Sequence, residues 1–486
     1  MPLKQFTIDF RELGKEKSFR YDVDFLDFQN EFLAERFYSF NDLFTFASEN
    51  KVDVEKLDDD FFYSEIGNIS KQGEVEPVKL NFNDRKEEEE NYYKKIEKGD
   101  IIKAKENEIL LSKVRPNLKK YVFINKDNKD YFYTSAFIHL APKKLNKILY
   151  YSLRSIFYEN LIAISRQGKG YPTLKEDDFL NLKFDKRIID KLSDKQDKIV
   201  AQIEPIERKI KELKNQIIPA REIINKVFAR EFGFDKNLFN EFGKGMTAGT
   251  QIAENRNLRT FETNFSNLDK SSILRFSTRF HNTPTKKLMD FLDSIQTLQI
   301  KNVISENVHR GASPKYNPDG EIPVVKTGHL KNGYIEISQE EFVDQDFYNS
   351  SVRSQVKEGD ILIASTGKVS LGKIDLLKTD QDLVADGHIS IIRVDEEKYN
   401  RLFLTYYFRS ILGYFQIERD FTGATNQIEL YADEISNFQI PNIPLKSQQK
   451  IVDEIKTELD KQEEINQTIE TERNKIDGII EKAIKV

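Results

Sequence analysis

The residues in this sequence whose types and spacing suit a chemical task are basic and amide-bearing side chains in or near two loops. Lysine and arginine suit phosphate oxygens, while arginine, asparagine and glutamine can read base edges through paired hydrogen bonds. The candidate nucleic-acid contacts are Lys113, Arg115, Lys119, Lys120, Arg166, Lys169, Lys368, Lys373, Thr425, Asn426 and Gln427. For any one of them alone, a solvated surface loop or a turn that serves the fold is the simpler interpretation.

Nucleotide binding is a second possible chemistry, because residues 367–374 read GKVSLGKI. This segment fits the phosphate-binding pattern GxxxxGK up to its last position, where Ile374 replaces the magnesium-binding serine or threonine. The corresponding loop at residues 113–120 contains no glycine. A P-loop NTPase therefore stays open only as a minor alternative.

Other catalytic classes lack their residues. The chain has no cysteine, which excludes thiol nucleophiles, iron–sulfur clusters and Cys-ligated zinc. Its 5 histidines stand far apart and form no metal-binding pair. GxSxG is missing, and so are the glycine-rich loop and NPPY-like tetrapeptide of a methyltransferase. We therefore expect no catalytic residue, no metal and no cofactor in this chain.

Length and charge define the broad class of protein. A chain of 486 residues is long enough for about three folding units. The net charge of −6 argues against coating nucleic acid through overall charge, but it leaves room for local basic loops. The first residues lack a signal-peptide pattern, and no stretch approaches the ~18 to 20 apolar residues of a membrane span, so we expect a cytoplasmic protein.

The elements that position the candidate residues repeat along the chain. Residues 107–112 align with residues 359–364 at an offset of 252, and residues 174–184 align with 430–440 at an offset of 256. Further matches in the same order join residues 198–200 to 450–452 and residues 20–21 to 275–276. These matches indicate two copies of one unit, each with a strand-rich mixed part followed by a long helix.

The helix of each copy has a heptad pattern. Apolar residues recur at alternating steps of four and three, and a 3.5-residue period keeps one apolar seam facing a partner helix. The predicted seam residues are Ile199, Ile203, Ile206, Ile210, Leu213, Ile217, Ile455, Leu459, Ile469 and Ile476. Pro205 and Pro219 predict a break or kink near either position, because proline removes a backbone donor.

Both seams are satisfied if the two helices pack against each other within the chain. Two copies related by a pseudo-two-fold axis make such a pair an antiparallel coiled coil. The alternative, in which each helix packs on its own globular domain, explains an amphipathic stripe but not two heptad patterns at matching places.

The predicted fold is therefore α/β (α+β), with two tandem domains separated by two long helices in an internal repeat. The first domain covers residues 1–189 and its helix covers 190–232. A connecting segment at 233–270 leads to a second domain at 271–445 and a final helix at 446–486.

Together these pieces resemble the DNA specificity (S) subunit of type I restriction–modification systems. The resemblance covers nearly the whole chain, and the order of domain, helix, domain and helix is more specific than any one string. It rests on residues 359–373, 422–427 with 435–444, 447–452, 109–116 and 168–184.

The resemblance implies that each half contains a target-recognition domain that reads one half of a split DNA sequence. The antiparallel helices would then fix the gap between the half-sites, since about 40 residues at 1.5 Å each give at most ~60 Å. The first copy has GKGYP at 168–172 where the second has TNQ at 425–427, so contacts with individual bases are not carried over.

The resemblance also implies partners. These are double-stranded DNA, type I methyltransferase (modification) subunits and a restriction translocase subunit. S-adenosylmethionine and ATP would belong to those partners, which makes this chain a non-catalytic specificity subunit. A coiled-coil scaffold that binds only protein remains the main alternative, followed by the P-loop NTPase.

Overall fold

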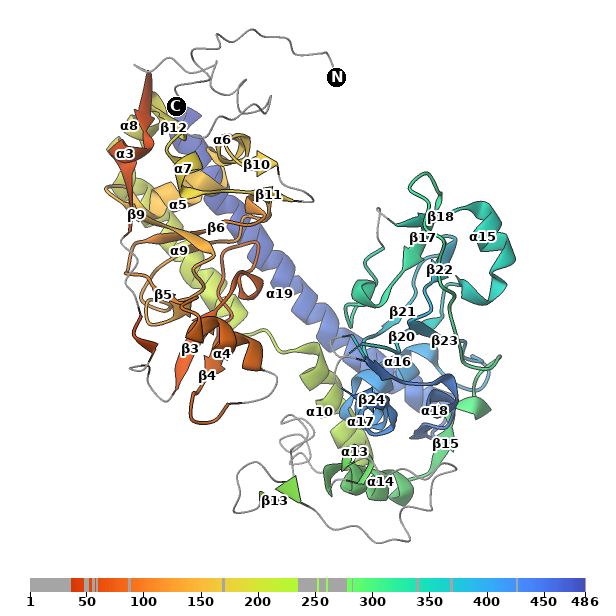
Figure 1. Ribbon diagram of the computed structural model, residues 1–486. Coiled ribbons are helices and arrows are strands. Elements are labelled where there is room, and N and C mark those ends of the chain that lie inside the picture. The colour runs from red at the N-terminus through yellow and green to blue at the C-terminus, as the bar shows by residue number, and fades with distance from the viewer. Residues whose placement is uncertain are drawn as a thin grey trace. The chain divides into compact units, whose positions relative to one another are not determined.

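The protein is described by a computed structural model that divides the chain into two compact units (Figure 1). It describes residues 36–47, 52–54, 57, 60–85, 89–167, 171–234, 251–252, 259–260, 278–281, 283–337, 341–367, 370–424 and 427–485. Unit 1 comprises residues 1–215 with 467–486, and unit 2 comprises residues 216–466. Each unit mixes helices and sheets, which confirms the predicted fold class at that level. No helix in the described part is both long and apolar enough to cross a membrane.

Unit 1 is built from short strands and helices. Its strands are β1 (Phe37–Ser39), β2 (Phe44–Phe46), β3 (Phe61–Ser64), β4 (Val78–Leu80), β5 (Ile102–Lys103), β6 (Ile109–Ser112), β7 (Tyr121–Phe123), β8 (Phe132–Tyr133), β9 (Phe137–Pro142), β10 (Arg166–Gln167), β11 (Pro172–Thr173) and β12 (Lys183–Asp185). Its helices are α3 (Phe40–Leu43), α4 (Glu90–Glu97), α5 (Asn146–Arg154), α6 (Tyr158–Ala163), α7 (Glu176–Phe179), α8 (Lys186–Asp194), α9 (Gln196–Lys214) and the last part of α19 (Leu445–Lys485).

Unit 2 contains the first part of α19 and the remaining elements. Its strands are β13 (Gln251–Ile252), β14 (Arg259–Thr260), β15 (Thr297–Gln299), β16 (His309–Arg310), β17 (Ile322–Val325), β18 (Phe342–Val343), β19 (Gln355–Val356), β20 (Ile361–Ala364), β21 (Ile374–Leu376), β22 (Leu383–Ala385), β23 (Ile389–Ile392), β24 (Thr422–Ala424), β25 (Gln427–Glu429) and β26 (Gln439–Pro441). Its other helices are α10 (Ala220–Phe232), α13 (Thr278–His281), α14 (Thr283–Ser294), α15 (Gln345–Ser350), α16 (Arg401–Arg409), α17 (Ile411–Asp420) and α18 (Ala432–Ser436).

The two units share their strand orders. Unit 1 has the sheets β2-β9-β6-β7 and β4-β3-β8-β5, and unit 2 has the sheets β16-β23-β20-β21 and β18-β17-β22-β19. The pairs β1-β12 and β10-β11 of unit 1 correspond to β15-β26 and β24-β25 of unit 2. In both units one strand pair is parallel, β3 with β8 and β17 with β22. The correspondence therefore extends to the direction of the strands.

The central strands β6 and β20 explain the apolar runs that the sequence comparison aligned. All four residues of each strand are buried. Side chains of a strand alternate between its faces, and in β20 Ile361 and Ile363 belong to one hydrophobic cluster while Leu362 and Ala364 belong to another. Because both faces of such a strand are buried, its sequence is a continuous apolar run and does not alternate between polar and apolar residues.

The predicted helix at 190–232 is interrupted. Helix α9 ends at Lys214 and α10 begins at Ala220, with Pro219 at its N-cap. Pro205 lies inside α9 without ending it. Ile217 falls between the two helices and is 37% exposed, so its assignment to the apolar seam was wrong. The physical reason is the proline, which disfavours helical backbone in the residue before it.

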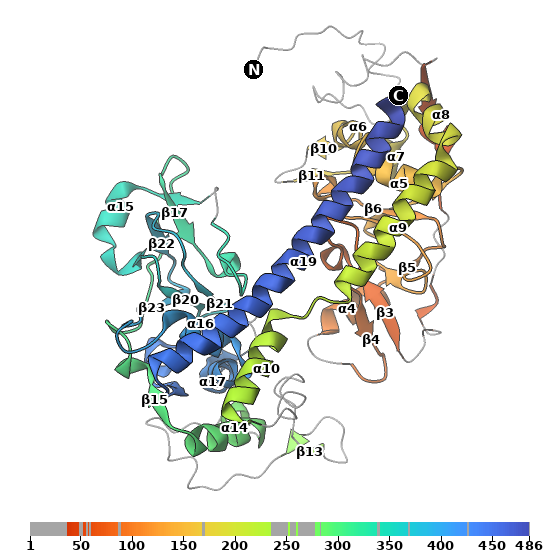
Figure 2. The ribbon, with the colours of Figure 1, turned by 180° about the vertical axis from the view of Figure 1, so that it is seen from behind.

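In each unit a helix of the 190–232 region runs antiparallel to α19 (Figure 2). In unit 1 the ammonium groups of Lys195 and Lys209 contact Ala483 O at 3.0 Å and Glu472 Oε1 at 2.6 Å. In unit 2 Arg230 pairs with Glu454, and Ile218 N donates to Gln462 Oε1 at 2.8 Å. In each unit, the earlier residue of the first helix contacts the later residue of α19. The two helices therefore point in opposite directions.

The other predicted seam residues lie in the helices. Fully or almost fully buried are Ile199, Ile203, Ile210, Ile455, Ile469 and Ile476, and half-buried are Ile206, Leu213 and Leu459. The helices also pack on the globular parts, because the core of unit 2 joins residues of α10 and α19 to residues of α16. The predicted match of residues 20–21 with 275–276 lies outside the described residues.

Candidate DNA interface

In unit 1 the basic loop after β6 is fastened to the β10-β11 hairpin. The backbone N of Arg115 donates to Pro172 O at 2.9 Å, and Leu174 N donates to Lys113 O at 2.9 Å. Val114 and Thr173 form a β-bridge between these two bonds. The loop and the hairpin therefore form one continuous edge of unit 1, which we call the unit 1 reading edge (residues 113–120, 166–167 and 171–173).

Unit 2 has the same arrangement. Gly367 N donates to Ile428 O at 3.1 Å, Leu430 N donates to Ser365 O at 2.9 Å, and Thr366 forms a bridge with Glu429. Each loop residue lies 252 positions, and each hairpin residue 256 positions, after its counterpart in unit 1. The structure thus brings together the two segments that the sequence comparison aligned at two different offsets. We call residues 365–367, 370–373, 422–424 and 427–430 the unit 2 reading edge.

Three of the predicted lysines of unit 1 are held by the unit itself. Lys113, Lys119 and Lys120 donate from their ammonium groups to the carbonyl oxygens of Ser135 at 3.0 Å, Arg154 at 2.8 Å and Ile66 at 3.0 Å. Burial lowers the pKa of Lys120, and the nearby charge of Lys71 lowers it further. These lysines are half-buried, and their contacts stabilise the loop.

Arg166 also has an internal partner. Its Nε lies 2.8 and 2.9 Å from the two carboxylate oxygens of Asp178, whose side chain is 1% exposed. An arginine engaged in this way is positioned to hold the hairpin against α7, and its charge is neutralised by the carboxylate.

Arg115 differs from the other predicted cations of unit 1 that the structure describes. It is exposed, and its guanidinium carbon lies 5.2 Å from the ring centroid of Tyr171, a side chain that is 43% exposed. Within the described part of the chain, no carboxylate or carbonyl accepts a hydrogen bond from this guanidinium. Its backbone φ of 51° is left-handed, which non-glycine residues rarely adopt.

The predicted residues of unit 2 are described only in part. Lys373 is half-buried at the end of the loop, where its backbone N donates to Ser370 O at 3.0 Å. Gln427 opens β25 and is described through its backbone alone. Lys169 of unit 1 and Lys368, Thr425 and Asn426 of unit 2 lie outside the described residues.

The loop at 367–374 does not have the geometry of a phosphate-binding P-loop. In that motif the residues GK[ST] open a helix whose N-terminus faces the phosphates. Here strand β21 begins at Ile374 and pairs with β20. The nucleotide-binding alternative was therefore wrong, because the glycines at 367 and 372 serve a strand-to-strand turn with positive φ values of 86° and 79°.

Polar residues that the sequence comparison missed contact the unit 2 reading edge. Arg310 forms an ion pair with Glu429 and donates to Leu430 O at 2.8 Å, and its guanidinium carbon lies 5.5 Å from the ring of Tyr431. The hydrogen bond from Arg310 lowers the pKa of Glu429. His388 Nδ1 lies 2.8 Å from Thr366 Oγ1. Arg310 and His388 are distant in sequence from the predicted segments, so only the sheet brings them to this edge.

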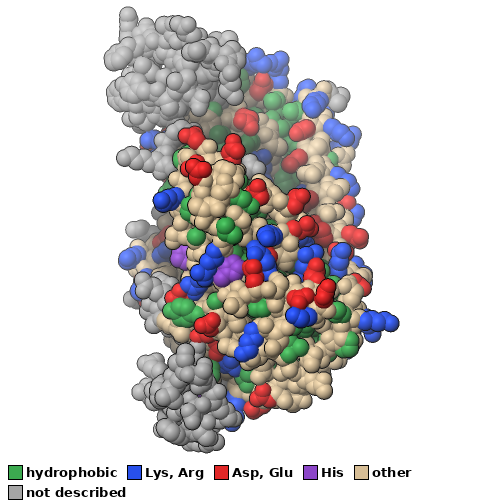
Figure 3. Space-filling model, turned by 90° about the vertical axis from the view of Figure 1, so that its right-hand side faces the viewer, with side chains coloured by type: hydrophobic (Ala, Val, Ile, Leu, Met, Phe, Trp, Pro, Cys, Tyr) green, Lys and Arg blue, Asp and Glu red, His purple; other side chains and the backbone are tan. Residues whose placement is uncertain are grey.

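Histidine side chains reach the surface beside lysine and arginine side chains in Figure 3. The described histidines of unit 2 are His281, His309, His329 and His388. Among the described residues there is no group of three or more histidines and carboxylates that could hold a metal ion.

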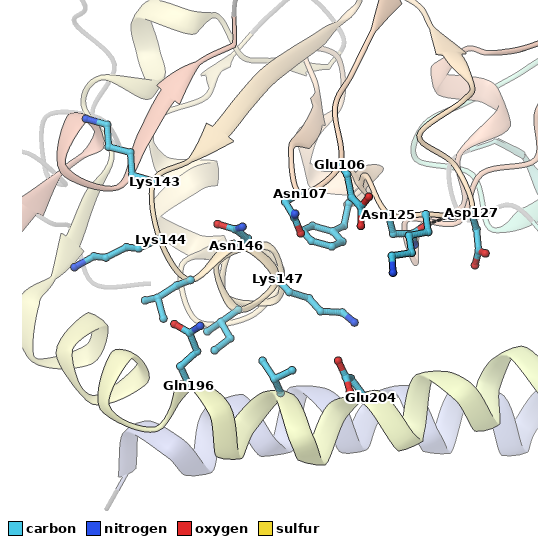
Figure 4. Close-up of a pocket in the computed structure, with 15 residues that line it drawn as sticks. Glu106, Asn107, Asn125, Asp127, Lys143, Lys144, Asn146, Lys147, Gln196 and Glu204 are labelled. Atoms are coloured by element: carbon cyan, nitrogen blue, oxygen red, sulfur yellow. Dashed lines mark hydrogen bonds between the residues drawn. The ribbon is translucent and has the colours of Figure 1, made fainter.

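Unit 1 also has an open cleft of about 850 Å³ between α9 and the globular part (Figure 4). Lys147 and Glu204 project into this space, whereas Lys143 and Lys144 point away from it. Glu106 and Asn107, which precede β6, line the cleft, while the reading edge follows the end of β6. None of the predicted DNA-contacting residues lines this cleft.

Comparison with known protein families gives a match in the second half of the chain. Residues 293–473 match the model of the type I restriction modification DNA specificity domain. Comparison with curated proteins gives no significant match.

Three solved structures are similar over most of the chain. One comes from work on the structural basis of complex assembly and conformational transition of the type I R-M system. It has 14% identity and a TM-score of 0.39, with coverage of 92% of this chain and 97% of that chain. The HsdS subunit from Thermoanaerobacter tengcongensis has 14% identity and a TM-score of 0.30, with coverage of 93% and 96%. The type I S subunit from M. genitalium has 13% identity and a TM-score of 0.40, with coverage of 92% and 95%.

The family match includes β20 and the unit 2 reading edge, and it extends into α19. It confirms, over this segment, the resemblance that the sequence suggested. Residues 293–473 are a type I restriction–modification DNA specificity domain.

Proposed function

We propose that this chain is the DNA specificity subunit of a type I restriction–modification complex and that each unit reads one half of a split DNA target. The observation that carries the proposal is the family match at residues 293–473. The first half has the same strand orders and the same bonds between loop and hairpin. These shared features support an internal duplication, and hence the same function for unit 1.

The reading edges are the proposed contact surfaces. In unit 1 the edge has an exposed arginine whose guanidinium makes no hydrogen bond or ion pair with the described residues. In unit 2 it has the half-buried Lys373, and Lys368, Thr425 and Asn426 are close to it in the sequence. Arginine, asparagine and glutamine suit base edges, and lysine suits phosphates. The net charge of −6 predicts weak DNA binding by the isolated chain, so partner subunits would supply further phosphate contacts.

The antiparallel helices are the proposed spacer between the half-sites. Apolar residues of α9, α10 and α19 are buried in heptad-like positions, which supports a coiled-coil seam. Adding one heptad to α19 and one to α9 should then change the gap between the half-sites and leave the half-sites themselves intact. An unchanged gap would remove the spacer from the proposal.

The proposed chemistry of methylation and cleavage belongs to partner subunits. Modification subunits would bring S-adenosylmethionine, and a restriction translocase would bring ATP. This chain would contribute binding and no catalytic residue.

The proposal is tested by selection from a randomised duplex library with this chain in complex with its modification subunits, at moderate salt. Two short enriched blocks separated by a constant, unread gap are expected. A stable complex that enriches no sequence would instead favour the scaffold that binds only protein. A single enriched block would mean that one unit does not read DNA.

A further inference from the structure

Among the predicted cations of unit 1 that the structure describes, Arg115 is the one whose side-chain donors remain free for a ligand. Lys113, Lys119 and Lys120 donate to backbone carbonyls, and Arg166 is paired with Asp178. The guanidinium of Arg115 instead lies over the Tyr171 ring, 5.2 Å from its centroid. A guanidinium that lies over an aromatic ring can still present its N–H groups to a ligand in the plane of the fork.

The backbone at Arg115 is held in an unfavourable conformation. Arg115 has φ 51°, and unit 2 has Gly367, with φ 86°, at the position that makes the equivalent backbone bond. A left-handed conformation is unfavourable for a residue with a Cβ, because the Cβ comes too close to the following carbonyl oxygen. Unit 1 therefore keeps an arginine where glycine would serve the turn at lower cost, and strain of this kind concentrates at functional sites.

Orientation distinguishes a base contact from a phosphate contact. A phosphate requires positive charge, which a flexible lysine supplies as well as an arginine. The O6 and N7 acceptors of guanine match the two parallel N–H groups that an arginine fork holds at fixed spacing. The bond from Arg115 N to Pro172 O and the contact with the Tyr171 ring both restrict the direction of the side chain.

We propose that Arg115, oriented by Tyr171, is a base-reading residue of unit 1 that recognises one guanine in the major groove. The inference rests on the proposed function, since it names one contact of the same edge. Tyr171 is a positioning residue, because it acts on the base through the guanidinium.

The test is library selection and competition binding with the complex of this chain and its modification subunits. Arg115→Ala should reduce the preference for guanine at one position of one half-site by about 5- to 150-fold and leave the other half-site unchanged. Arg115→Lys keeps the charge but lacks the fork, so the preference for guanine should fall, while affinity for targets with another base at that position should change little. Tyr171→Ala should weaken that preference partly, and Tyr171→Phe should retain it.

Lys129→Ala is the matched control, since Lys129 is an exposed cation of unit 1 outside the reading edge. It should leave every position of the target unchanged. A uniform loss of affinity in Arg115→Ala, with unaltered preference, would overturn the inference in favour of a phosphate contact. Unchanged affinity and unchanged preference in Arg115→Ala would also overturn the inference. The proposed function would still stand in either case if the wild-type complex reads two half-sites. Circular dichroism and thermal melting check that the variants fold.

Discussion

The loop after β6 and the loop after β20 have equivalent backbone bonds but different residues at their bends. Unit 1 places Arg115 and Lys119 at φ 51° and 53°, and unit 2 places Gly367 and Gly372 at φ 86° and 79°. Glycine accepts a positive φ without the Cβ clash that a lysine or arginine meets. The backbone bonds therefore preserve the shape of the reading edge, while the side chains at the bends are free to differ.

A second difference concerns the arginine that ends α5 and α16. In unit 1 the guanidinium of Arg154 donates to the carbonyl oxygens of Lys119 at 2.6 Å and Lys71 at 2.5 Å. In unit 2 the side chain of Arg409 is 10% exposed and forms an ion pair with Asp375, which also accepts three backbone N–H groups of residues 331–333. The same position thus fastens a loop in one unit and neutralises a buried carboxylate in the other.

The largest expected effect comes from exchanging a whole domain. Replacing residues 271–444 by the second domain of another specificity subunit should reduce the preference for the original half-site of unit 2 by about 10³-fold or more. The half-site of unit 1 should stay as it is, because the edges belong to separate compact units. Library selection measures both, and a change in both half-sites would contradict independent reading.

Asp375→Ala should be the most destabilising of the single substitutions considered. It leaves Arg409 buried without its partner, which typically costs about 3–5 kcal/mol. Arg154→Ala should lower stability less, by about 1–3 kcal/mol, because Arg154 donates to neutral backbone carbonyls and its side chain is only half-buried. Hydrogen exchange followed by mass spectrometry resolves the two units separately. Equal losses of stability in the two variants would contradict a larger contribution from the ion pair of Asp375 and Arg409.

Exchanging residue types at the bends should shift stability in opposite directions. Arg115→Gly should stabilise unit 1 by up to about 1 kcal/mol, since it relieves the left-handed strain. Gly367→Ala should destabilise unit 2 by about 1–2 kcal/mol, although a Cβ at that position would meet no atom within 4 Å. Denaturation monitored by hydrogen exchange provides both values. The same sign for both variants would contradict the comparison of the bends.

The smallest expected effect is a pH dependence confined to unit 2. The short helix at Thr327–His329 is capped by a hydrogen bond from Lys326 N to His329 Nδ1 at 3.2 Å, and unit 1 uses Asn68 for the equivalent bond from Glu65 N at 2.9 Å. Burial lowers the pKa of His329 below 6.5.

A lowered histidine pKa means that the unfolded chain binds the proton more tightly. The contribution of His329 to stability is therefore complete above pH 6.5 and is lost as the pH falls through the lower pKa of the folded state. His329→Asn reproduces the asparagine cap of unit 1, so the stability of the variant should depend less on pH. Thermal melting of both proteins between pH 5 and 7.5 checks this, and an identical slope in the variant would assign the dependence to other groups.

Much of the architecture could be predicted from the sequence because it depends on local apolar runs. The ILLS and ILIA segments became the buried central strands β6 and β20, and the heptad pattern became α9, α10 and α19. The interruption at residues 215–219 follows from Pro219, although the seam assignment of Ile217 ignored it. Such features are predictable since they depend on residues close together in the chain.

The candidate site was predictable only as two sets of segments. The sequence identified the basic loop and the glycine-containing segment of each half, but the pairing of Val114 with Thr173 is a contact between distant residues. Arg310 and Tyr431 were missed for the same reason, because no local pattern joins them.

The repeat of about 250 residues, the apolar strands and helices, and the absence of cysteine chemistry follow from the sequence alone. Which of the described predicted cations of unit 1 are available to DNA depends on the folded structure. Lysine and arginine have long side chains that bond to whatever acceptor lies nearby, and Lys119 and Arg166 find theirs in residues that folding brings close. Arg115 stays available because the left-handed turn directs it over Tyr171, a relation that exists only once the loop and hairpin have met.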